Sequence, residues 1–149
     1  MFRPTCQSRS LSRPDAPSLY FHNALGRVLL HAGAGYVRIE WQAAPMASQE
    51  LRAVYEHTLH LLRREGLTRV LTDHRHMLPY TAADRDWLTT QWVPRAVTEA
   101  GYRRCAIVQA HAVLNQLATK HMVQELSSAP LELQHFAEPE PAMAWLLAD

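Results

Sequence analysis

The spacing of hydrophobic residues changes near residue 47, and this change divides the chain into two kinds of structure. Before it, apolar and polar residues alternate in three short runs, at 19–24, 27–31 and 36–42, punctuated by Gly26 and by Gly33-Ala34-Gly35. Alternation interrupted by glycine turns predicts neighbouring antiparallel strands. In the third run Val37, Ile39 and Trp41 occupy alternate positions, so we expect their side chains to face the core.

After residue 47, segments with helical spacing alternate with short apolar runs. Ser48 and Gly66 bound the first helical segment, as a capping residue and a stop residue would. Further helices are expected at 81–101, at 113–126 and from Pro139 onward, and strands at 68–73, 103–109 and 131–136. This order predicts a single α/β domain with a mixed sheet, first antiparallel and then parallel, whose ligand crevice lies beyond the carboxyl ends of the parallel strands. Continuous apolar runs predict that the following residues are fully buried: Val70, Leu71, Ala106, Ile107 and Val108.

The helix expected at 81–101 contains two features with structural consequences. Thr81 precedes it and Asp84 lies three residues later, a spacing that predicts a side-chain cap at the helix start. Pro94 lies inside the apolar pattern, so we expect a kink or a break near Trp92.

The composition is typical of one globular domain, with 149 residues, 48% of them hydrophobic and 19% charged. We expect residues 19–149 to form this domain and residues 1–18, which are rich in Arg, Ser and Pro, to be a disordered extension. The net charge of +1 gives no reason to expect nucleic acid as a partner. No apolar run approaches the roughly 18 residues that span a bilayer. The two cysteines do not make a disulfide framework, so a cytoplasmic location is expected.

Several features together resemble the SpoIIAA-like family: the order of elements, Asp73-x-Arg75 at a strand end, the helix at 87–101, the strand at 106–108, and Phe136 followed by Ala142-x-x-Trp145-Leu146. That family has the STAS fold of anti-sigma-factor antagonists and is similar to CRAL-TRIO lipid-binding domains. The resemblance covers roughly residues 19–149. It implies a small α/β domain that acts as a non-enzymatic binding or regulatory module.

The resemblance also bears on Thr81. In regulatory antagonists a serine at a helix start is phosphorylated, and the corresponding stretch here reads Tyr80-Thr81-Ala82-Ala83. Thr81 is therefore the candidate phosphorylation site that the resemblance implies. Asp84, one turn further on, would repel a phosphate on it, and capping of the helix is the competing role.

Polar and aromatic residues gather where the predicted strands end. Candidate residues for binding a ligand or a partner are Asp73, His74, Arg75, Tyr80, Thr81, Trp87, Trp92, His111 and Asn115. The two tryptophans are expected either in the core or along an apolar groove or interface, with Tyr80 at its rim. Such a surface would serve a second copy of the chain, a partner helix or an apolar ligand.

Metal binding and catalysis find less support in the sequence. Residues that raise the question of a metal are His57, His60, Asp73, His74 and His76. Nothing in the spacing brings His57 to Asp73, so no metal site is expected, and no motif calls for a cofactor. Asp73 and His74 are adjacent in a strand and so point to opposite faces, and Cys105 lies in an apolar strand where it is expected to be core.

We therefore expect a non-enzymatic regulatory or binding module for a protein partner or a small ligand. Two alternatives stay open: lipid or another apolar ligand in a groove beneath the helix that contains Pro94, and a small enzyme that uses the histidine-rich crevice. The largest pocket discriminates between them. An enclosed apolar pocket favours an apolar ligand, a polar pocket at the strand ends favours an anion or catalysis, and the absence of a pocket favours a protein partner.

Overall fold

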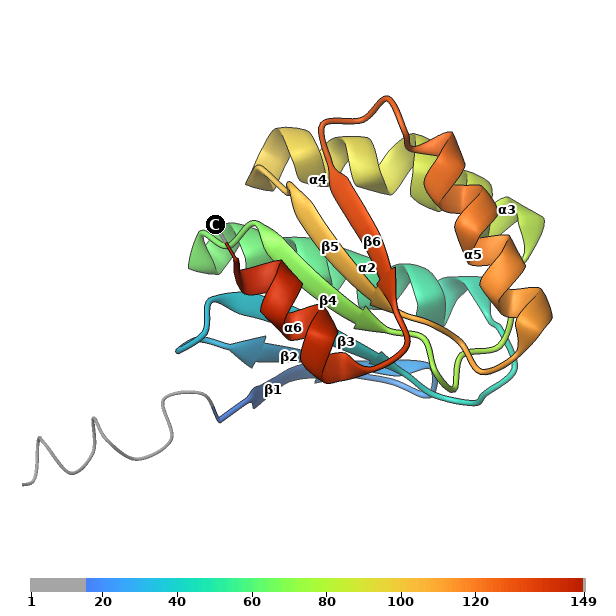
Figure 1. Cartoon of the computed structure of the whole chain (residues 1–149), viewed down its shortest axis with the longest axis horizontal. Helices are drawn as coiled ribbons and strands as arrows, with labels where there is room; N and C mark the ends of the chain where they lie inside the picture. The colour runs from blue at the N-terminus through green and yellow to red at the C-terminus, as the bar shows by residue number, and fades with distance from the viewer. Residues whose placement is uncertain (1–15, 149) are drawn as a thin grey trace, which may run out of the picture.

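The computed structural model describes residues 16–148, except for the side chains of residues 114 and 115 (Figure 1). The expectation for the extension therefore falls largely outside the described residues. The strands are β1 (Ser18–His22), β2 (Gly26–His31), β3 (Tyr36–Trp41), β4 (Arg69–Asp73), β5 (Arg104–Val108) and β6 (Glu132–Phe136). The helices are α2 (Ser48–Glu65), α3 (Ala82–Trp87), α4 (Val93–Ala100), α5 (Val113–Glu125) and α6 (Pro139–Leu147), and a π-helical turn, η1 (Leu88–Trp92), joins α3 to α4.

The six strands form one mixed sheet in the order β1-β2-β3-β4-β5-β6. The first three strands pair antiparallel, and β3 to β6 pair parallel. The α/β class and the change from antiparallel to parallel pairing, both predicted from the hydrophobic spacing, are confirmed. The parallel pairing aligns Glu40 with Asp73 and Asp73 with Val108, so the carboxyl ends of three strands meet at one edge of the sheet.

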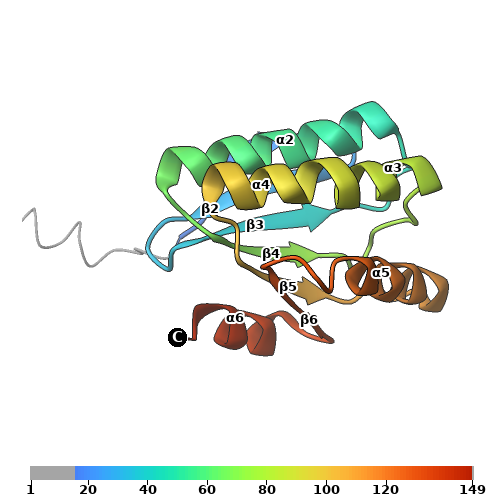
Figure 2. The ribbon, with the colours of Figure 1, turned by 90° about the horizontal axis from the view of Figure 1, so that it is seen from above.

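Helices cover the two faces of this sheet unequally, as Figure 2 shows. The α2 helix and the α3-η1-α4 helix lie on one face, and α6 lies on the other. The larger core forms under the first face, and its sheet residues include Val37, Ile39 and Trp41, which are at most 3% exposed, as predicted. The smaller core forms under α6 around Leu71 and Ala106. The residues predicted to be fully buried are all at most 3% exposed: Val70, Leu71, Ala106, Ile107 and Val108.

The start of α2 differs from the prediction, although its end does not. Ala47 occupies the N-cap position without a side-chain bond, and Ser48 is already helical, so the expectation that Ser48 caps the helix is wrong. The Ser48 hydroxyl instead donates to the buried carboxylate of Asp84, at 2.9 Å. Gly66 ends the helix with φ 66°, a left-handed conformation that glycine adopts without steric cost.

Pro94 neither breaks nor ends the helix in which it lies, contrary to one of the two expectations. A proline ring clashes with the carbonyl four residues earlier in a regular α-helix. Here the preceding turn is π-helical, and the Val93 amide donates to the Leu88 carbonyl five residues back. The wider turn accommodates Pro94 and keeps Leu88 and Trp92 both facing the core, at 4% and 2% exposure.

Candidate functional site

The site begins at the end of β4, where neighbouring residues point to opposite faces of the sheet, as the strand geometry predicted. Asp73 points to the face that α6 covers in part, into an open polar hollow. His74 points to the α2 face, where it lines an internal cavity. The predicted crevice at the strand ends therefore corresponds to the polar hollow alone, and the cavity lies on the other side of the sheet, beneath it.

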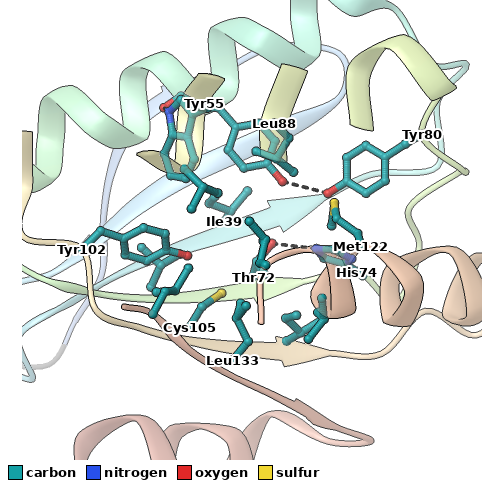
Figure 3. Close-up of a pocket in the computed structure, with 17 residues that line it drawn as sticks. Ile39, Tyr55, Thr72, His74, Tyr80, Leu88, Tyr102, Cys105, Met122 and Leu133 are labelled. Atoms are coloured by element: carbon teal, nitrogen blue, oxygen red, sulfur yellow. Dashed lines mark hydrogen bonds between the residues drawn. The ribbon is translucent and has the colours of Figure 1, made fainter. Parts of the chain in front are cut away.

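The internal cavity lies between the sheet, the α3-η1-α4 helix and α5, and it is partly enclosed (Figure 3). Its volume is about 40 Å³. One water molecule needs roughly 10–15 Å³, whereas an apolar cavity of about 150 Å³ holds a benzene ring. The lining residues are mostly apolar, and among them are Ile39, Val70, Leu88, Trp92, Ile107, Met122, Leu126 and Leu133. No Lys, Arg, Asp or Glu belongs to the lining.

A buried chain of hydrogen bonds holds His74 at the cavity wall. Trp41 Nε1 donates to the Thr72 hydroxyl oxygen at 2.9 Å, and this oxygen lies 3.0 Å from His74 Nε2. His74 is 2% exposed, and its Nδ1 atom has no hydrogen-bond partner among the described residues. Burial, and to a smaller extent the charge of His135, lower the pKa of His74 to about 4, although the carboxylate of Asp73 opposes this change. The imidazole is therefore neutral at physiological pH.

Two tyrosines bring further polar groups to the same cavity. The hydroxyl oxygens of Tyr55 and Tyr80 lie 2.8 Å apart, and Figure 3 shows them pointing at one another from α2 and from the segment before α3. Burial raises the pKa of both phenols, so both remain protonated. Burial also raises the pKa of Cys105 to about 12, although a hydrogen bond with Tyr102 opposes this rise. The thiol is thus core, as predicted, and is not a thiolate nucleophile.

The polar hollow on the opposite face has a volume of about 400 Å³ and is built around paired charges. Arg75 donates to both carboxylate oxygens of Asp73, at 2.8 to 3.3 Å, and Arg38 reaches Asp73 at 3.3 Å. Glu40 pairs with Arg27 and with Arg38. Burial alone would raise the pKa of Asp73, but the Arg75 hydrogen bonds outweigh it and the pKa lies below its usual value. The charges of the guanidinium and carboxylate groups are thus paired, although Arg38 Nε makes no hydrogen bond with the described residues.

The other predicted site residues are dispersed. The Asp84 amide donates to the Thr81 hydroxyl oxygen at 3.1 Å, which is the predicted cap. Trp92 lies in the core, with its Nε1 donating to the Tyr55 carbonyl at 2.8 Å. Trp87 is partly buried, with the Arg52 guanidinium 5.0 Å from its ring centre. His111 is exposed, and its ring packs edge-on against that of His76, with ring centres 5.4 Å apart. Asn115 lies in α5, and its side chain is outside the described part of the chain.

The remaining histidines do not converge. His57 stacks on Phe21 of β1, with ring centres 3.8 Å apart, and His60 stacks on Tyr20. His74 lies apart from both of them, in the wall of the internal cavity. Within residues 16–148, no three His, Cys, Asp or Glu side chains are grouped so that they could hold a metal ion.

Most of the polar groups in the cavity wall were not identified from the sequence. Tyr55, Thr72 and Tyr102 read as ordinary members of a helix, a strand and a loop, and Cys105 was assigned to the core alone. Thr72 carried a signal: it is a polar residue on the face of β4 that also carries Val70. A hydroxyl on a face packed against a helix needs a buried partner, which here is His74.

Among the described residues, no helix is both long enough and apolar enough to cross a membrane. Comparisons of the chain with protein-family profiles, with curated protein sequences and with solved structures found no significant match.

Proposed function

We propose that this protein is a non-enzymatic binding module whose internal cavity holds a small, largely apolar ligand. One observation carries the proposal: a partly enclosed and mostly apolar cavity has a buried imidazole in its wall, and one nitrogen of that imidazole lacks a partner among the described residues. Leaving a buried polar atom unpaired costs about 1–3 kcal/mol, so such atoms are usually satisfied by a ligand or by water.

The chemistry of the cavity supports binding over catalysis. An imidazole whose pKa is about 4 is a weak general base at neutral pH, and a thiol whose pKa is about 12 is not an effective nucleophile. The polar hollow supports the alternative of an anion site less well, because its arginines are already paired with Asp73 and Glu40. Membership of the SpoIIAA-like family, with its STAS fold, remains part of the same proposal.

Ligand entry requires part of the wall to move, and we infer that α5 is that part. Its apolar residues Val113 and Leu117 are 66% and 58% exposed, so they do not anchor the helix in the core. Met122 of α5 lies in the cavity wall, and its unbranched side chain adapts easily to a change of volume.

The proposal is tested with dissolved xenon, an apolar probe small enough for a cavity of about 40 Å³, and with protein labelled at its Ile, Leu and Val methyl groups. Saturable shifts of the Leu88, Ile107 and Leu133 methyl resonances are expected. Cys105→Leu, which fills the cavity, should abolish them, and Cys105→Ala, which enlarges it, should strengthen binding. Absence of saturable shifts in both the wild type and Cys105→Ala would contradict the proposal.

A protein partner or a second copy of the chain is the second candidate, and a specific groove favours it. Pro94, Val97 and Ala129 line a groove of about 460 Å³ on the outside of α4, where most lining residues are apolar or small. Trp92 does not contribute, because it is 2% exposed and lies in the core. Sedimentation velocity over a range of concentrations tests self-association. Ala129→Arg should abolish it, and a wild-type monomer at every concentration would remove the self-association version.

A further inference from the structure

Two histidines lie on the face of the sheet that carries the cavity. The parallel pairing places Thr72, Ile107 and His135 in one row across β4, β5 and β6. Thr72 and Ile107 line the cavity, so His135, which pairs beside Ile107, points to the same face. His74 follows Thr72 by two residues and lines the cavity as well (Figure 3). The two imidazoles therefore share one side of the sheet with α5, which forms another wall of the cavity.

Each of these imidazoles has a buried nitrogen without a hydrogen-bond partner among the described residues. The two atoms are Nδ1 of His74 and Nε2 of His135. A charged imidazolium needs an acceptor or water at both of its nitrogens, because both then carry a proton. The folded structure offers neither to these two atoms, so it disfavours protonation of both side chains.

The charges around the two histidines act in the same direction. Burial lowers the pKa of both, Lys120 of α5 lowers that of His135 further, and His135 lowers that of His74 further. The carboxylate of Asp73 opposes this change at His74, but it points to the opposite face of the sheet, where Arg75 binds it. Burial raises the pKa of the other titratable groups in the cavity wall, which therefore stay neutral: Tyr55, Tyr80, Tyr102 and Cys105.

The α5 helix is the wall of the cavity that can move most easily. Among the described helices it approaches the rest of the fold least closely. Thr119 and Met122 are its fully buried side chains among those described, and Met122 lines the cavity together with Val123. Displacement of α5 would remove this lining and admit water to the side of the sheet that carries His74 and His135.

Resting on the proposed function, we propose that α5 is an acid-operated gate: protonation of His74 and His135 favours a state in which α5 leaves the sheet and the cavity opens to solvent. In the open state water solvates both imidazolium groups, and His135 is separated from Lys120. Protons therefore bind the open state more tightly than the closed state, and acidification shifts the equilibrium toward it. The opening is local, so the strands and α2 remain folded.

Hydrogen exchange of the backbone amides, followed by NMR at pH 7 and pH 5, measures the equilibrium constant for opening of each segment. The pKa of His74 is about 4 in the closed state and about 6.5 once the ring is solvated, so His74 alone should raise the opening constant of α5 about 20-fold between pH 7 and pH 5. At both pH values the α5 amides should open more often than the amides of β2 and β3, which exchange when the whole domain unfolds.

Variants assign this pH dependence to the two histidines. In His74→Gln the increase should be several-fold smaller, and in the double variant His74→Gln, His135→Gln it should nearly disappear. His121→Gln is the matched control, because His121 lies on the exposed side of α5 beside Glu125 and should leave the increase unchanged. Protection of the β2 and β3 amides at pH 7 shows whether each variant is folded.

Two results would overturn the gate. One is an opening constant of α5 that is the same at pH 7 and pH 5, and the other is exchange of the α5 amides only together with those of β2 and β3. Neither result concerns xenon binding to the closed cavity at pH 7, so the proposed function would stand. Absence of xenon binding at pH 7 would overturn the proposed function, and with it the role of the opening as a gate for a ligand.

Discussion

The burial of His74 makes a quantitative prediction about how stability depends on pH. An exposed imidazole takes up a proton near pH 6.5, but the folded protein keeps His74 neutral down to about pH 4. Between these values the unfolded chain binds more protons than the folded one, so the free energy of unfolding falls as the pH drops from about 6.5 toward 4. The lowered pKa corresponds to a loss of about 3 kcal/mol over this window.

Urea denaturation at pH 7 and pH 4 measures this loss when the wild type is compared with His74→Gln. Glutamine does not titrate, and its side chain can hydrogen-bond Thr72. The variant should therefore lose about 3 kcal/mol less than the wild type between the two pH values, whatever the other histidines contribute. His135→Gln should also reduce the loss, but by less, because burial lowers the pKa of His135 to a smaller extent. Equal losses in the wild type and His74→Gln would refute the reasoning.

Three further predictions concern the residues around the site. Thr81→Ala should lower the free energy of unfolding by about 1 kcal/mol in urea denaturation, with Thr81→Ser close to the wild type; no effect would remove the cap from the account. Ile107→Ala should cost about 2–5 kcal/mol, because Ile107 is 3% exposed, and a cost below 1 kcal/mol would place it outside the core. Arg75→Gln should raise the pKa of Asp73, measured by NMR titration of its carboxyl carbon, because the Arg75 hydrogen bonds now hold that pKa down.

The fold could be predicted largely from the sequence because its signals are local. In a strand, apolar residues alternate with polar ones or form a continuous run, and in a helix they recur every three to four residues. The spacing within each element therefore predicts which of its residues are buried. Gly66 and Gly101 ended α2 and α4 where expected, since each takes a left-handed conformation that few other residues adopt. Pro139 likewise begins α6, where its missing N–H costs nothing.

The fold predictions that were wrong have a different origin. One depended on a hydrogen-bond partner distant in the sequence, and the other on how the helix accommodates a proline. Ser48 resembles a cap, but its hydroxyl bonds Asp84, 36 residues away. Pro94 signals a disturbed helix, but its sequence does not say whether the disturbance becomes a break or a π-helical turn. Packing of Leu88 and Trp92 into the core favours the continuous helix.

The candidate site could be predicted only in part. Only the polar hollow lies at the strand ends, where topology placed the crevice, and the opposite directions of Asp73 and His74 followed from strand geometry. The cavity itself depends on Tyr55 of α2, Tyr80 before α3 and Cys105 of β5, which only the tertiary packing brings together. A local sequence pattern therefore cannot predict a cavity that forms between separate elements of the fold.

The existence of a largely apolar internal cavity is the central claim, and diffraction from a crystal under xenon pressure tests it most directly. Xenon enters dry apolar cavities and scatters strongly. We predict a xenon peak among Leu88, Ile107 and Leu133 in the wild type, and none at that position in Cys105→Leu. A wild-type cavity without xenon, closed by side chains or filled with ordered water, would contradict the account.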